Sequence, residues 1–161
     1  MIIRPTLRFV LAHPAHFLAL GFGTGLAPVA PGTIGTLLGF PIYGLLAQRL
    51  APAELLGVVA AMFALGIWAC SKTGTDLGMA DHGAMNWDEV VAFLLILMVT
   101  PPGLGWQAFA FFAFRFFDVV KPPPIRYFDR TIKGGLGVMF DDIVAAFYTL
   151  LAMAIVKQLF F

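Results

Sequence analysis

The sequence predicts an all-α protein, a polytopic bundle of membrane-embedded helices, and three observations favour this fold class. Hydrophobic residues make up 60% of the 161 residues and charged residues only 12%, whereas a soluble domain carries roughly 25% charged residues. Mean hydropathy is +0.91. Five apolar segments alternate with stretches rich in glycine, proline or charge, and none alternates like a barrel strand. We expect a single membrane-embedded domain over residues 1–161.

The N-terminal segment, residues 1–20, is predicted to lie at the membrane interface. Arg4 and Arg8 precede an apolar stretch that His13, Pro14 and His16 interrupt. A signal peptide needs an uninterrupted apolar core of about 7–15 residues. We therefore expect this segment to belong to the mature protein.

The five apolar segments are the predicted helices: Ile34–Leu50, Leu55–Ser71, Val90–Thr100, Trp106–Val120 and Ile143–Phe160. The first, second and fifth have 17 or 18 residues, close to the roughly 20 needed to cross a bilayer. The third would rise only about 17 Å. The third and fourth are therefore predicted to form a short helical hairpin that turns at residues 101–105, a strong helix-breaking sequence.

Connectivity predicts that most acidic residues meet on one side of the bilayer, the side of the N-terminal segment, which we call side A. Helices leave and return in turn, so residues 72–87 and 121–140 both lie on side A. Only Glu54 is then on side B. The eight acidic residues on side A, or at helix ends facing it, are Asp76, Asp81, Asp88, Glu89, Asp118, Asp129, Asp141 and Asp142. Basic residues divide eight to two, which predicts that side A is cytoplasmic.

A glycine-rich loop precedes the first apolar segment, over residues 21–36. Its glycines permit close backbone approach and its prolines stiffen it. Thr33 is expected to cap the first helix, whose free N–H groups would attract phosphate. Thr24, Gly32 and Thr33 are therefore predicted to bind substrate; a purely structural turn and cap is the alternative.

Four carboxylates, those of Asp76, Asp81, Asp88 and Glu89, lie within fourteen residues before a very apolar segment. Hard oxygen ligands suit Mg²⁺ or Ca²⁺, and the single cysteine and few histidines argue against zinc. Helix capping is the alternative, but one acid satisfies that role. His82 lies close to two of these acids in the sequence.

Two further blocks carry charge into apolar sequence. Arg115, Asp118 and Lys121 are spaced as helical neighbours, and ionisable residues inside a membrane helix indicate function. A local Arg115–Asp118 pair that only neutralises itself is the alternative. Asp141 and Asp142 are expected to open the fifth helix, one capping it and the other free to bind metal.

These blocks, in this order, resemble the phosphatidylglycerophosphatase A family. The matching pieces extend from Gly21 to about Ala146, and Asn86 departs from the pattern by standing where an apolar residue is expected before Trp87. They are residues 30–33, 81–83, 87–89, 114–118, 121–125, 137–139 and 141–142. The resemblance implies Mg²⁺-dependent hydrolysis of phosphatidylglycerophosphate to phosphatidylglycerol and phosphate at the bacterial inner membrane, in phospholipid biosynthesis.

Together, the residues and the resemblance predict one scheme at the cytoplasmic interface. One or two Mg²⁺ would be held by Asp88, Glu89, Asp118, Asp141 and Asp142. Arg115, Lys121 and Arg126 would neutralise the phosphate, and Asp81 or His82 would move the proton. Attack by an activated water and a covalent aspartyl-phosphate both fit the sequence.

Two other classes of protein use membrane-embedded acids in a different arrangement. A small transporter would use intramembrane acids for ion coupling, but such acids lie near the bilayer midplane rather than at helix ends. A lipid-headgroup transferase would carry a different set of spaced aspartates. A net charge of +1 gives no field to attract nucleic acid. The oligomeric state is not predicted.

Overall fold

The computed structural model describes residues 4–160, apart from the side chain of Asp129, and every regular element in that range is helical. The all-α prediction is confirmed for this part of the chain. The elements are α1 (Leu7–Ala12), α2 (Pro14–Ala19), the 3-10 turn η1 (Gly21–Leu26), α3 (Pro31–Ala47), α4 (Pro52–Leu77), α5 (Trp87–Val99), α6 (Leu104–Val120), α7 (Ile125–Thr131) and α8 (Gly134–Phe160).

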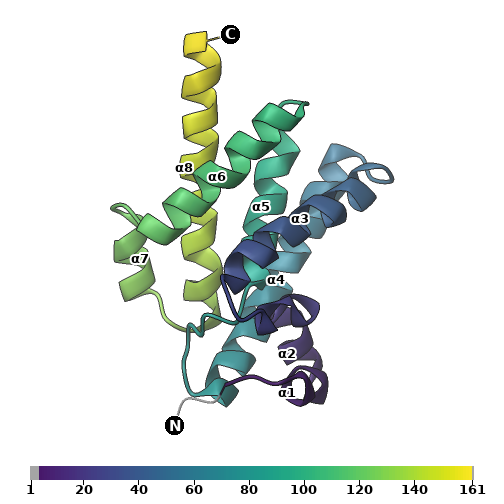
Figure 1. The fold of residues 1–161 in the computed structure, drawn as a ribbon, viewed down its shortest axis with the longest axis vertical. Helices are drawn as coiled ribbons and strands as arrows, with labels where there is room; N and C mark the ends of the chain where they lie inside the picture. The colour runs from purple at the N-terminus through teal and green to yellow at the C-terminus, as the bar shows by residue number, and fades with distance from the viewer. Residues whose placement is uncertain (1–3, 161) are drawn as a thin grey trace.

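The helices alternate in direction along the long axis of the molecule (Figure 1). The N-terminal helices and the α4–α5 loop lie at one end, the start of α8 lies on the same half, and α7 lies near the middle of this axis. The α3–α4 turn, the α5–α6 turn and the end of α8 lie toward the other end. The up-and-down course of α3, α4, α5, α6 and α8 agrees with the predicted connectivity, whereas α7, predicted on side A, does not lie at the same end as α1 and α2.

Two helices, α4 with 26 residues and α8 with 27, are long and apolar enough to cross a membrane. The other predicted membrane segments form shorter helices: α3 and α6 have 17 residues each and α5 has 13. Two clear candidate spans therefore stand where five membrane-embedded segments were expected.

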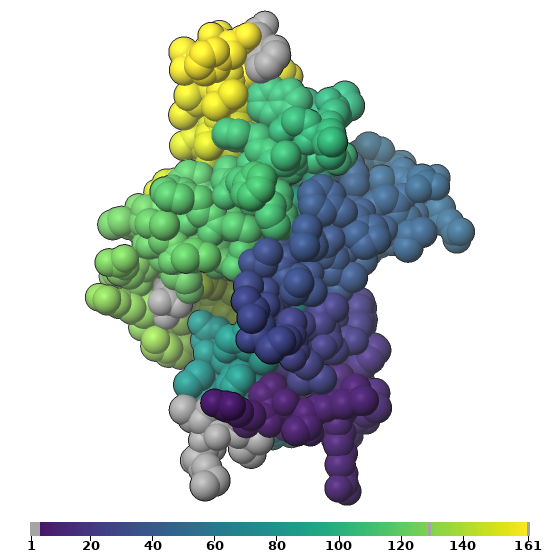
Figure 2. Space-filling view, viewed as in Figure 1, coloured from purple at the N-terminus to yellow at the C-terminus, as the bar shows by residue number. Residues whose placement is uncertain are grey.

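Helix α5 is the centre of the bundle. Its side chains Val90, Phe93, Leu94 and Ile96 are fully buried, and it packs against α3, α4, α6 and α8. In the space-filling view, α3 and α6 cover the front of the molecule and hide most of α5 (Figure 2). Its apolar character is that of a helix surrounded by protein, and it carries its first-turn acids into the interior.

Helix α8 begins at Gly134, nine residues before the predicted start of the fifth helix. The glycines at its beginning are poor helix formers, but a Cβ on Gly135 would lie 2.0 Å from the Ile67 carbonyl oxygen in α4. Close packing therefore outweighs helix propensity here. Asp141 and Asp142 lie two turns inside α8, so the prediction that they open and cap the helix is wrong.

Helix α4 continues to Leu77, six residues beyond its predicted end at Ser71. Lys72 pairs with Asp76 one turn later, and Nε2 of the buried His16 lies 2.8 Å from Asp76 Oδ2. These contacts stabilise the last two turns, and Gly78 ends the helix with a left-handed φ of 74°. Residues 72–77, expected in a loop, are therefore helical.

Candidate active site

The site is built around three buried carboxylates from α5 and α8. One oxygen from each of Asp88, Glu89 and Asp142 lies within 4.8 Å of the others. Asp88 and Glu89 occupy the first turn of α5, and Asp142 faces them from the interior of α8. Residues 53 positions apart in the chain thus form one cluster, which we call the acid cluster.

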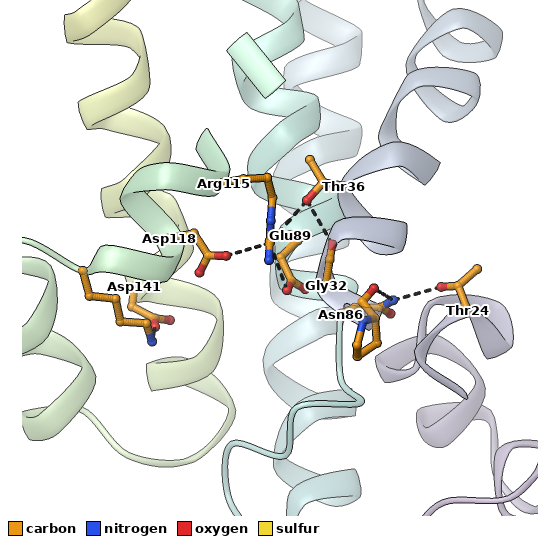
Figure 3. Close-up of polar contacts among 10 residues, drawn as sticks. Thr24, Gly32, Thr36, Asn86, Glu89, Arg115, Asp118 and Asp141 are labelled. Carbon is orange, nitrogen blue, oxygen red and sulfur yellow. Dashed lines mark hydrogen bonds and ion pairs between the residues drawn. The ribbon is translucent and has the colours of Figure 1, made fainter. Parts of the chain in front are cut away.

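Asp118 and Arg115 of α6 border the acid cluster (Figure 3). Arg115 Nη1 lies 2.6 Å from Asp118 Oδ2 and 3.4 Å from Glu89 Oε1. The Asp118 carboxylate is also close enough to repel the carboxylates of both Glu89 and Asp142. The local Arg115–Asp118 pair considered from the sequence does exist, but Arg115 also reaches α5, so the pair is part of the site.

Lys121 pairs with Asp141 across the gap from α6 to α8. Lys121 ends α6 with a left-handed φ of 45°, and this turn directs its side chain away from the helix that carries Arg115 and Asp118. The predicted helical spacing therefore holds only as far as Asp118. The five predicted metal ligands divide into the three of the acid cluster, of which only Glu89 has a basic partner in the described residues, and two outside it, Asp118 and Asp141, that pair with Arg115 and Lys121.

The first turn of α3 closes a further side of the site. A Cβ on Gly32 would lie 2.0 Å from Glu89 Oε1 and 3.1 Å from Arg115 Nη2, so only glycine leaves room for the Glu89 carboxylate. The helix begins at Pro31 after Ala30, which has a left-handed φ of 47° and makes no side-chain cap. Thr33 lies inside the first turn, and the prediction that it caps α3 is wrong.

The acid cluster has the features of a cation site. Asp88 Oδ1, Glu89 Oε2 and Asp142 Oδ2 are buried without a hydrogen-bond partner. Within residues 4–160, no lysine or arginine pairs with Asp88 or Asp142. Burying several carboxylates together is costly unless a positive charge compensates them. Because all the donors are oxygens, the residues fit Mg²⁺ or Ca²⁺.

Four predicted site residues lie apart from the acid cluster. The Thr24 hydroxyl donates to the Gly21 carbonyl oxygen at 2.7 Å, as part of the loop's own structure. Asp81 is exposed and lines a surface pocket with Lys133. His82 Nδ1 accepts from the Ala84 N–H at 3.1 Å. Arg126 is exposed on α7, where its guanidinium donates to the Val120 carbonyl oxygen at 3.4 Å.

Sequence reasoning missed two buried polar residues beside the acid cluster. The Thr36 hydroxyl donates to the Gly32 carbonyl oxygen at 3.0 Å and lies 3.5 Å from Arg115 Nη1. The Asn86 side chain donates to Thr24 and Pro31. For Asn86 a signal existed, because it is a polar residue where the family pattern has an apolar one. Thr36 ends the glycine-rich loop, but no charge or matching family motif singled it out.

Comparison with known proteins identifies the family of the chain. The family model described as Phosphatidylglycerophosphatase A matches residues 17–157, a range that includes every residue of the site. No solved structure matches the chain.

Two relatives are similar over most of their length. The phosphatidylglycerophosphatase A of Haemophilus influenzae is 43% identical over 151 residues, which cover 92% of this chain and 92% of that protein. The phosphatidylglycerophosphatase A of Escherichia coli is 41% identical over 140 residues, which cover 86% of this chain and 80% of that protein. The resemblance found in the sequence is confirmed: the chain belongs to the phosphatidylglycerophosphatase A family of hydrolases.

Proposed function

We propose that this chain hydrolyses phosphatidylglycerophosphate to phosphatidylglycerol and phosphate in a Mg²⁺-dependent reaction at the surface of the bacterial cytoplasmic membrane. The observation that carries this proposal is the acid cluster. One oxygen from each of its three carboxylates lies within 4.8 Å of the others, and each carboxylate has a buried oxygen without a hydrogen-bond partner. The named activity of the two bacterial relatives supplies the substrate.

Asp88, Glu89 and Asp142 would hold Mg²⁺, with Asp118 and Asp141 as adjoining ligands or as partners of the basic residues. Bound there, Mg²⁺ would supply a Lewis acid for a phosphoryl oxygen and lower the pKa of a bound water. Arg115 and Lys121 would neutralise the phosphate oxygens. The first-turn N–H groups of α3, at Gly32 and Thr33, lack acceptors within the helix and would donate to the phosphate.

The assigned roles of the outlying residues differ from the prediction in two respects: Asp81 and His82 no longer move the proton, and Arg126 no longer neutralises the phosphate at the metal. Asp81 and His82 lie toward the side A end, and Arg126 lies on α7, so they would meet the lipid headgroup before it reaches the acid cluster. The proton that the departing glycerol oxygen takes up would come from water or from a residue nearer the metal. The transporter alternative gains no support from the family or from acids gathered in a single cluster.

We place α4 and α8 across the bilayer, with the α5–α6 hairpin and α3 packed beside them and the acid cluster toward the cytoplasm. The acyl chains of the substrate would stay in the bilayer while the phosphomonoester enters the charged layer. Exposed large apolar side chains on α4, α6 and α8 suit a lipid surrounding; they include Leu65, Phe112, Phe116, Phe147 and Leu151.

The function is tested by measuring phosphate release from purified protein with phosphatidylglycerophosphate, phosphatidic acid and a soluble phosphomonoester. We expect turnover of the first substrate that stops with excess chelator and returns with Mg²⁺, while Zn²⁺ restores it poorly because the site has only oxygen ligands. Full turnover in excess chelator would exclude the metal mechanism, and preference for another substrate would exclude the assigned specificity.

The membrane orientation predicts a labelling pattern for single cysteines in a Cys70→Ser background. Met79→Cys and Lys133→Cys should react with a membrane-impermeant thiol reagent from the cytoplasmic side only. Ala53→Cys should react only from the opposite side. All three positions are exposed. Labelling of Met79→Cys and Lys133→Cys from opposite faces would contradict this topology.

A further inference from the structure

We infer that Asn86 is a positioning residue that holds the glycine-rich loop and the first turn of α3 against the carboxylates of α5. This inference rests on the proposed function, because it assigns the loop and α3 to phosphate binding. Asn86 is fully buried and immediately precedes the first turn of α5, which carries Asp88 and Glu89.

The side chain of Asn86 joins the two ends of the loop. Its Nδ2 donates to Thr24 Oγ1 at 3.0 Å and to the Pro31 carbonyl oxygen at 2.9 Å (Figure 3). A carbonyl oxygen can only accept, so the atom facing Pro31 is the amide nitrogen and both of its hydrogens are used. Asn86 stands at the N-cap of α5 but makes no side-chain cap there. A favoured capping residue is therefore used to hold another segment.

The backbone around Asn86 is also closely packed. Its N–H donates to the Ala19 carbonyl oxygen at 3.0 Å. A Cβ on Gly21 would lie 2.3 Å from Asn86 Oδ1, and a Cβ on Gly35 would lie 2.7 Å from the Asn86 carbonyl oxygen. The end of α2, the loop and α3 thus all meet at this one residue, and a side chain of different shape would displace them.

The position of the loop is transmitted directly to the acid cluster. Pro31, which Asn86 holds, is followed by Gly32, where an added Cβ would lie 2.0 Å from Glu89 Oε1, so the backbone of α3 is packed closely against this carboxylate. The Gly32 carbonyl oxygen accepts from Thr36, which in turn contacts Arg115. Asn86 therefore fixes the distance between the N–H groups of α3 and the metal ligands of α5, the distance that a phosphate must span.

The test compares Asn86→Leu, which keeps the side-chain size but removes both donors, with Thr24→Val, which removes one of the two acceptors. Inorganic phosphate is the probe, used as a competitive inhibitor and as a thermal stabiliser in the presence of Mg²⁺. We expect Asn86→Leu to raise the inhibition constant of phosphate and the KM of the lipid about tenfold, because the N–H groups of α3 are no longer preorganised. The Mg²⁺ concentration that gives half-maximal thermal stabilisation should not change.

Thr24→Val should cause a smaller effect in the same direction, and the double variant should resemble Asn86→Leu alone, because both changes break the same contact. Thr100→Val, which removes a hydroxyl that donates to the Ile96 carbonyl oxygen at the far end of α5, is the matched control and should leave both constants unchanged. If Asn86→Leu does not fold, Thr24→Val alone decides.

A variant whose melting temperature falls while both constants stay at the wild-type values would reduce Asn86 to a packing residue and overturn the inference. Failure of the proposed function is a different result, because the wild-type protein would then release no phosphate. Stabilisation by phosphate would still show in that case whether Asn86 positions the first turn of α3, and wild-type stabilisation in Asn86→Leu would overturn the inference independently.

Discussion

Asp142→Asn is expected to lower kcat on the order of 10³-fold while leaving the protein folded and more resistant to heat without metal. Asn keeps the shape of the side chain but removes its negative charge, so the amide is a much weaker ligand for Mg²⁺ than the carboxylate. The same change relieves repulsion among three buried carboxylates. In a protein of this size, each kcal/mol of relief raises the melting temperature by about 2–4 °C.

The stability measurement makes this prediction specific to a metal site. Addition of Mg²⁺ should stabilise the wild-type protein, and this increase should be lost in Asp142→Asn and in Glu89→Gln. Glu54→Gln is the control: its carboxylate accepts from the Ala51 N–H at 2.8 Å at the start of α4, far from the cluster, and its loss should not change kcat. If the three single variants Asp142→Asn, Glu89→Gln and Asp118→Asn all kept the wild-type kcat, these acids would have a structural role only.

Gly32→Ala is expected to lower kcat about 10²-fold with little loss of stability. The added methyl group would lie 2.0 Å from Glu89 Oε1, an overlap that the backbone of α3 cannot relieve. The Glu89 carboxylate, at the end of a flexible side chain, would move instead. A displacement of about 1 Å at a catalytic group is sufficient for a loss of this size.

Gly44→Ala provides a matched control in the same helix. A Cβ at Gly44 meets no atom within 4 Å, so activity should be unchanged, and helix propensity predicts that stability rises by about 0.5–1 kcal/mol. Equal loss of activity in the two variants would show that α3 responds to any change, rather than to contact between Gly32 and Glu89.

The parts of the fold that follow from local rules were predictable from the sequence. The breaker sequence at Pro101 and Pro102 placed the turn correctly, and the predicted fourth helix ends at Val120 as observed. The start of α8 was not predictable, because Gly135 is helical only through its fit against α4. Helix α7 was also missed, since its seven residues follow three prolines and carry no apolar run.

The site shows the same division. Acids in a chain this apolar are costly, so their burial cost, together with the family resemblance, singled out Asp88, Glu89, Asp118, Asp141 and Asp142 as candidate site residues. The sequence could not show contacts between distant segments. The Asn86–Thr24 hydrogen bond joins residues 62 positions apart and the Arg115–Thr36 contact residues 79 apart, and neither has a local pattern.

The position of Asp142 in the last helix has a consequence for biosynthesis. The α5–α6 hairpin leaves the ribosome before α8, and it contains both members of the Glu89–Arg115 pair, so the nascent chain would carry part of its own charge compensation. Asp142 emerges later and completes the acid cluster only when α8 packs against α4 and α5. An interrupted chain that lacks α8 would therefore be inert toward membrane lipids, and hydrolysis would begin only in a finished molecule.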